Sequence, residues 1–127
     1  MLDIEVVREK LSSQIVTLLQ PVVVNSTTLR VIWEVRRNQR YVQGYRIKYR
    51  EVLSEELSSG RHTRHNIQSP SYTVETTQGT GITSHMLYHL AKYTWYDIRV
   101  QPFYRGVEGI DSNNVRARTS EDGLYNV

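Results

Sequence analysis

Leu29-Arg30-Val31-Ile32-Trp33-Glu34-Val35-Arg36 is a stretch in which every second residue, beginning at Leu29, is apolar. Successive side chains of a β-strand point to opposite faces, so the apolar residues at positions 29, 31, 33 and 35 would share one face. Of the four residues that alternate with them, at positions 30, 32, 34 and 36, three are charged. The stretch therefore predicts a strand with one face in a core and the other towards solvent.

The same period of two recurs in three later segments. It covers residues 41–52, where aromatic and apolar residues alternate with basic ones, then 96–101, and more weakly 114–119. The first strand and the 41–52 strand, joined by a polar turn, would form a hairpin or an arch. Shorter candidate strands cover residues 14–24, 72–76 and 85–87. Short strands between turn-rich stretches predict an all-β fold, a seven-stranded antiparallel immunoglobulin-like sandwich, with a barrel as the alternative.

Length and composition limit the class of protein. The 127 residues fit one domain, and 39% hydrophobic with 23% charged residues is typical of a soluble globular protein. No stretch approaches the roughly 18 apolar residues that span a bilayer, and residues 1–5 are too charged for a secretory signal. We expect Met1 to be a cytosolic initiator or the start of a fragment of a secreted parent. The absence of cysteine excludes disulfides and thiolate zinc sites.

The sequence predicts one domain over residues 15–120, between an N-terminal linker over 1–14 and a C-terminal linker over 121–127. Apolar residues follow a helical spacing within the first linker, but the run is too short to form a stable helix alone. We therefore expect at most one helical turn there. Residues 53–70 have no sustained period and many serines, which predicts a mobile loop.

Four residues carry a resemblance to a known family. These are Trp33 on the predicted strand above, Tyr45 in a Tyr-x-Ile-x-Tyr run, and Leu90 six residues before Tyr96. Together they resemble the fibronectin type III signature. The resemblance implies that these four side chains pack between the sheets and that Tyr96 forms a tyrosine corner.

A closer resemblance rests on separated segments. Residues 7–11, 25–33, 41–50, 96–104 and 109–112 are similar to the second fibronectin module of the Roundabout axon-guidance receptors. The resemblance implies the extracellular part of a single-pass plasma membrane receptor, next to other immunoglobulin and fibronectin domains. Its ligand Slit would contact other domains, and this module would serve as a spacer and as a contact with a second receptor copy. The alternatives are a ligand-binding fibronectin module of another adhesion or cytokine-type receptor, or an accessory sandwich of a secreted carbohydrate-active enzyme.

Catalysis and metal binding have little support in the sequence. No Gly-x-Ser-x-Gly motif or phosphate-binding glycine loop occurs, so we expect no enzyme and no cofactor. On an extended strand His85 and His89 would lie about 13 Å apart, which is too far for one zinc ion. His62 and His65 have no carboxylate or thiolate beside them in the sequence. We expect no metal site.

Asn25-Ser26-Thr27 matches the Asn-x-Ser/Thr acceptor sequence for N-linked glycosylation. The triplet falls in the predicted turn between the first two strands, where the amide would face solvent. Given an extracellular location, we expect a glycan on Asn25.

Basic side chains would gather on one outward face if strands 41–52, 96–101 and 114–119 are neighbours, as the resembled family implies. The cations are Arg46, Lys48, Arg50, Arg99, Arg116 and Arg118, with Asp97 and Gln101 among them. Like charges opposite one another destabilise a sheet, so counter-charges or an anionic partner would relieve them. The hypothesis is weak binding of heparan sulfate or an acidic protein surface, against the alternative of a solvated face. An extracellular location argues against nucleic acid.

Two aromatic residues share the outward phase of the 96–101 strand. These are Trp95 and Phe103, and large rings at a surface often mark contacts. Trp95 has a second interpretation, in which it covers the edge of the core near Tyr96.

Overall fold

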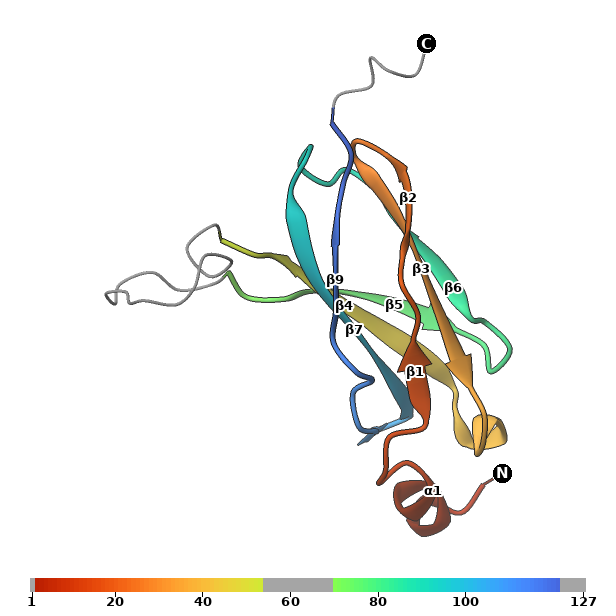
Figure 1. Ribbon diagram of the computed structural model, residues 1–127. Coiled ribbons are helices and arrows are strands. Elements are labelled where there is room, and N and C mark those ends of the chain that lie inside the picture. Colours follow the sequence, from red (N-terminus) through yellow and green to blue (C-terminus); the bar gives the residue numbers. More distant parts are fainter. Residues whose placement is uncertain (1, 54–69, 122–127) are drawn as a thin grey trace.

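The computed structural model describes residues 2–53 and 70–121, which form two packed β-sheets (Figure 1). The elements are α1 (Ile4–Lys10), β1 (Val16–Leu18), β2 (Val22–Asn25), β3 (Thr28–Val35), a 3-10 helix (Gln39–Tyr41), β4 (Gly44–Glu51), β5 (Thr73–Gln78), β6 (Ser84–Leu87), β7 (Trp95–Tyr104), β8 (Val107–Glu108) and β9 (Val115–Arg118). The predicted mobile loop at residues 53–70 lies almost wholly outside the described residues, as does most of the expected C-terminal linker.

Each sheet is built on one long strand. In the first sheet β3 pairs with β1 and β2 at one edge and with β6 at the other. In the second sheet the order is β5-β4-β7, and both β8 and β9 pair with β7. Every pairing among the described strands is antiparallel. The predicted all-β antiparallel sandwich is confirmed.

The strand count differs from the predicted seven because the first and last strands are each divided in two. Pro21 lies between β1 and β2, and proline has no N–H to donate to a ladder. The last strand is likewise divided into β8 and β9, which pair with different ends of β7. Of the two alternatives for the connection after β3, the arch is correct, because β3 and β4 belong to different sheets.

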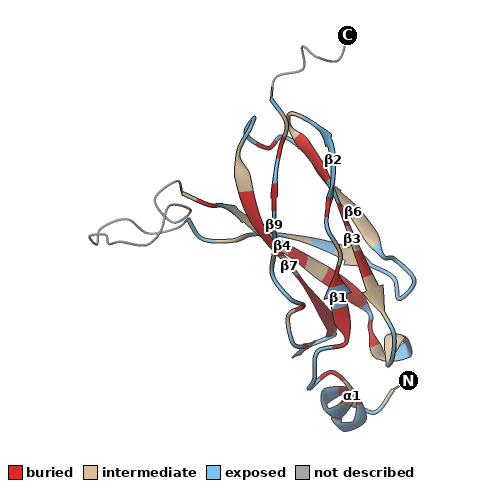
Figure 2. Ribbon diagram, in the orientation of Figure 1, coloured by how far each residue is buried: buried red, intermediate tan, exposed pale blue. Residues whose placement is uncertain are grey.

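The core lies between the sheets and contains the four residues of the family signature. Trp33 and Tyr45 are fully buried, with ring centroids 5.1 Å apart, and Leu90 and Tyr96 are nearly so. Buried positions, red in Figure 2, recur along β3, β4 and β7. The Tyr96 hydroxyl accepts a hydrogen bond of 2.8 Å from the Ala91 backbone N–H. This bond ties the loop before β7 to the strand and forms the tyrosine corner.

The N-terminal segment, predicted as a linker over residues 1–14, packs against the sandwich. Asp3 is the N-cap of helix α1, and its carboxylate accepts from the Glu5 N–H at 2.9 Å. Val7 and Leu11 belong to the hydrophobic core, with 0% and 1% of their surface exposed. The helix is too short to be stable alone, so burial of its apolar side chains supplies its stability.

The packed helix also determines where the chain enters the domain. Helix α1 lies at one end of the sandwich, and residues 119–121, which follow β9, lie at the other end (Figure 1). No helix in the described ranges 2–53 and 70–121 is long and apolar enough to cross a bilayer.

Candidate interaction face

The outward side of the five-stranded sheet brings the six predicted cations together. Strands β4, β7 and β9 are neighbours, as predicted, with Lys48 opposite Arg99 and Arg50 opposite Asp97. We call this side the basic face and define it by Arg46, Lys48, Arg50, Arg99, Arg116 and Arg118. It is held by the register of three strands, so its charges lie in fixed rows.

Asp97 lies beneath the basic face and is 2% exposed. Its carboxylate accepts from Arg50 Nη2 at 3.3 Å and from Arg116 Nε at 3.4 Å. The Asn114 amide and the Tyr72 hydroxyl also donate to it. One buried carboxylate therefore links cations from the two strands that flank β7.

These contacts set the charge state of Asp97. Burial alone would raise the pKa of this carboxyl, because the charged form loses its hydration. The hydrogen bond from Asn114 and the charges of Arg116 and Arg50 outweigh burial and hold the pKa below its ordinary value. Asp97 is thus ionised at neutral pH and balances part of the positive charge.

Asp111 supplies the second counter-charge, from the connection between β8 and β9. Its oxygens lie 3.0 Å from Lys48 Nζ and 3.6 Å from Arg99 Nη1. Since Lys48 and Arg99 are directly opposite each other, Asp111 relieves a repulsion that the register imposes. Of the two predicted ways to relieve the repulsion, internal counter-charges and an anionic partner, the first is therefore correct for four of the six cations. These are Lys48, Arg50, Arg99 and Arg116.

Aromatic rings fill the spaces between the cations. The Arg46 guanidinium lies 4.2 Å from the centroid of Phe103, and those of Arg50 and Arg99 lie 4.5 and 5.0 Å from that of Tyr72. At these distances the cations are attracted to the ring faces. The basic face is thus an interleaved layer of cations and rings.

Phe103 is not exposed, which corrects the prediction. Its phase is outward, but only 5% of its surface is accessible. Gly44 lies opposite it on β4 and has no side chain, and an added Cβ there would come within 2.9 Å of the Phe103 ring. The ring therefore occupies the space over Gly44, and the Arg46 guanidinium packs on the same ring.

Trp95 is half-buried, at the opposite end of the face from Phe103. The Arg118 guanidinium lies 5.3 Å from the Trp95 ring centroid and 4.0 Å from that of Tyr93. Arg118 and Tyr93 are themselves exposed. Arg118 thus extends the basic face to an accessible corner of the molecule.

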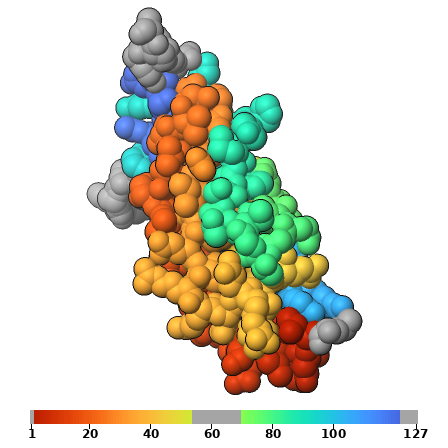
Figure 3. Space-filling model, turned by 90° about the vertical axis from the view of Figure 1, so that its right-hand side faces the viewer, coloured from red at the N-terminus to blue at the C-terminus, as the bar shows by residue number. Residues whose placement is uncertain are grey.

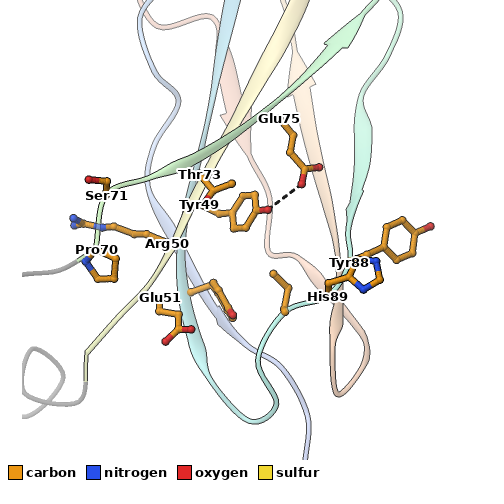
Figure 4. A pocket seen from close by; sticks show the side chains of 11 residues that line it. Tyr49, Arg50, Glu51, Pro70, Ser71, Thr73, Glu75, Tyr88 and His89 are labelled. Carbon is orange, nitrogen blue, oxygen red and sulfur yellow. Dashed lines mark hydrogen bonds between the residues drawn. The ribbon is translucent and has the colours of Figure 1, made fainter.

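A pocket of about 450 Å³ lies between the β4 and β5 strands and the loop after β6, and Arg50 of the basic face is among the residues that line it. Figure 4 shows Pro70 and Ser71 on one side of it and Tyr88 and His89 on the other. The Tyr49 hydroxyl donates to Glu75 at 2.9 Å. Burial, together with Glu75, raises the pKa of Tyr49 to about 12, so its ionised form is rare at neutral pH. A nucleophile or general base needs the opposite shift.

Comparisons with known proteins agree with the geometry. The family model of the fibronectin type III domain matches residues 15–118. The chain belongs to the fibronectin type III family. Human Roundabout homolog 2 is 33% identical over 116 residues, which is 91% of this chain and 8% of that protein. Human Roundabout homolog 1 is 28% identical over 120 residues, 94% of this chain and 7% of that protein. The resemblance to Roundabout receptors is confirmed, and this chain spans less than a tenth of their length.

Solved structures show the same fold. The third fibronectin III domain of human KIAA0343 protein aligns with a TM-score of 0.59 at 29% identity, covering 88% of this chain and 90% of that one. The FN1–FN3 domains of chicken CNTN1 align with a TM-score of 0.59 at 21% identity, covering 80% of this chain and 30% of that one.

Two residues of this fibronectin domain belong to the face and were missed in the sequence. Tyr72 is the first residue of the predicted strand 72–76 and has the same phase as the outward Val74, so applying the alternation to that strand would have found it. Asp111 follows no period, because it lies in a connection rather than a strand.

A contact between the two sheets was also missed. His85 on β6 lies 2.7 Å from Glu75 on β5, from ring Nε2 to carboxylate Oε1. His89 lies beyond the end of β6, and His62 and His65 fall outside the described residues. Across residues 2–53 and 70–121, no three His, Cys, Asp or Glu residues are grouped so that they could hold a metal ion.

Proposed function

We propose that this fibronectin domain is a non-catalytic extracellular module of a Roundabout-like single-pass receptor for Slit that acts in axon guidance. The observation that carries the proposal is the 33% identity to Roundabout homolog 2 across 91% of the chain. The module spaces and orients neighbouring immunoglobulin and fibronectin domains, and Slit contacts other domains.

The position of α1 supports the spacer role. Val7 of helix α1 and Leu11, the residue after it, are buried in the core, and residues 119–121 lie at the far end of the sandwich (Figure 1). A segment that packs on its own domain cannot swing freely as a flexible linker does. The orientation of a preceding domain relative to this module is therefore restricted.

Deletion of the module from a receptor that carries it tests this role. Slit affinity measured on the isolated ectodomain should not change, because the ligand contacts other domains. Signalling in cells should fall, and an unrelated fibronectin domain of the same length should restore it. A large loss of Slit affinity on deletion would instead favour a module that binds the ligand directly.

We also propose that the basic face binds heparan sulfate weakly. Six cations share the face with only two carboxylates within salt-bridge distance in the described structure, Asp97 and Asp111, so the face keeps a positive charge. Arg116 and Arg118 are exposed at one end of it. The internal ion pairs hold the cations in fixed positions, which reduces the entropy lost when an extended anion binds.

Exposed arginines on the two sheets provide a matched test. Arg118→Glu reverses a charge on the basic face, and Arg30→Glu reverses one on the outward side of β3 in the other sheet. The Arg118 variant should elute from immobilised heparin at a lower salt concentration than the Arg30 variant. Equal elution of both would mean that net charge, and not this face, causes retention.

A second receptor copy is the protein partner that we propose. Among the described strands, β5 pairs with β4 alone, so one side of its backbone is open for a further strand. Sedimentation at several concentrations tests this contact. A chain that stays monomeric at high concentration would leave spacing as the role of the module.

A further inference from the structure

Strand β2 exposes three consecutive valines. Val22, Val23 and Val24 are 48%, 43% and 46% exposed, so both faces of the strand are open to solvent (Figure 2). Figure 3 shows the chain around β2 and β3, in orange, at the molecular surface beside β6, in blue-green. Within the described part of the chain β2 pairs with β3 alone, which leaves its other edge without a partner strand.

The sequence around β2 lacks the charged residues that usually protect an edge strand. Natural sheets guard such edges with charges, prolines and bulges, because an open apolar edge recruits other chains. Here no charged residue occurs between Lys10 and Arg30. Pro21 precedes the strand and a register shift interrupts it after Val23, yet the valines stay exposed. A polar cover from another source would complete the protection.

Asn25 lies at the end of the same strand and is exposed. Its Oδ1 accepts from the Thr27 backbone N–H at 2.9 Å and from the Thr27 hydroxyl at 3.3 Å. In residues 2–53 and 70–121 the Nδ2 atom, which would carry a sugar, has no hydrogen-bond partner. Asn25-Ser26-Thr27 is the one Asn-x-Ser/Thr triplet of the whole sequence.

We propose that Asn25 carries an N-linked glycan and that this glycan covers the valines of β2. The proposal rests on the extracellular role proposed above. In the reaction the bond from sugar C1 to a lipid pyrophosphate donor breaks and the bond from C1 to Asn25 Nδ2 forms. The amide loses one proton, and the lipid pyrophosphate leaves. At roughly 3.3 Å per residue Val22 lies about 10 Å from Asn25, within reach of the first sugars.

The modification is tested on the chain secreted from eukaryotic cells behind an added signal peptide. Its mass should fall on glycosidase treatment, whereas that of a Thr27→Ala variant should not change. Thr27→Ala removes the acceptor triplet but keeps the backbone N–H that Asn25 binds. The control adds Gly81→Asn to this variant, two residues before Thr83 in an exposed turn, where an added Cβ meets no atom within 4 Å.

The control separates the two proposals. A glycan on the Gly81→Asn chain but not on the wild type would overturn the Asn25 proposal and leave the extracellular role standing. Secretion behind the added signal peptide does not test the extracellular role, which the deletion experiment above tests separately.

The covering role is tested by sedimentation of the secreted protein before and after glycosidase treatment. The treated protein should self-associate at concentrations where the glycosylated one is monomeric. Replacing the three valines with threonine should restore the monomer in the treated protein. Identical sedimentation of treated and untreated wild type would overturn the covering role.

Discussion

Asp97 stabilises the basic face through its contacts with Arg50 and Arg116. Asp97→Asn keeps the shape of the side chain but removes the negative charge, so two guanidinium groups lose their counter-charge. We expect a loss of about 1.5–3 kcal/mol in the free energy of unfolding at neutral pH, the range for hydrogen bonds to charged groups. Denaturant unfolding measures it.

The same substitution has a distinct pH signature. Because the folded protein lowers the pKa of Asp97, the unfolded chain binds this proton more tightly than the native state does. The stabilisation is present above the unfolded pKa, about 3.9, and is lost as the pH falls through the lower folded value. Asp97→Asn should flatten the fall in stability below about pH 4, and parallel curves for the two proteins would contradict the role of Asp97.

Gly44 shows how one residue without a side chain shapes the face. An added Cβ would lie 2.1 Å from the Thr77 carbonyl oxygen and 2.9 Å from the Phe103 ring. Gly44→Ala should therefore destabilise the protein by about 1–3 kcal/mol, the usual cost of overpacking. Gly106→Ala is the control, since a Cβ there meets no atom within 4 Å. Equal melting temperatures of the Gly44→Ala and Gly106→Ala variants would contradict the prediction, because they would mean that β4 and β5 can move apart at little cost in free energy.

At the scale of elements, the alternation of side chains predicts which face of β3, β4 and β7 is buried. It does not predict how deeply an outward residue is covered. Phe103 and Asp97 are in the outward phase but are buried, because Gly44, Arg46 and Arg50 come from a neighbouring strand. Such cover depends on register, which a single sequence does not give.

Helix α1 shows the same limit. The helical spacing of Val7 and Leu11 is visible in the sequence, but the residues that they pack against are far away in the chain. Leu11 lies against Gly109, for example, where an added Cβ would be 3.3 Å from Leu11 Cβ. A pattern in one segment cannot reveal a surface formed by distant ones.

The docking of α1 can be measured with two substitutions near each other. Leu11→Ala removes a side chain that is 1% exposed, and we expect it to lower the free energy of unfolding by about 2–5 kcal/mol. Val6→Ala changes a residue of helix α1 that is 37% exposed, and its effect should stay within about 0.5 kcal/mol. Similar small effects of both would mean that the helix contributes little and that the domain begins near residue 15.

At the scale of the whole molecule, the tyrosines of the core link packing to alkaline stability. Burial raises the pKa of Tyr45 to about 12, and burial together with Glu75 raises that of Tyr49 to about 12. Burial also raises the pKa of Tyr96. The native state therefore holds these protons more tightly than the unfolded chain, whose tyrosines ionise near pH 10. Their stabilisation is full below about pH 10 and is lost as the pH rises towards about 12.

We expect a late fraction in the alkaline titration of the nine tyrosines. Ultraviolet absorbance of tyrosinate should show this fraction appearing only above about pH 11 and together with loss of the folded circular dichroism signal. Tyr49→Phe should reduce its amplitude, since it removes one of the buried hydroxyl groups. It also removes the donor to Glu75, and the contact of that carboxylate with His85 across the two sheets would remain. Ionisation of every tyrosine near pH 10 in a protein that stays folded would mean that water reaches the space between the sheets, and the core would then be far looser than its burial indicates.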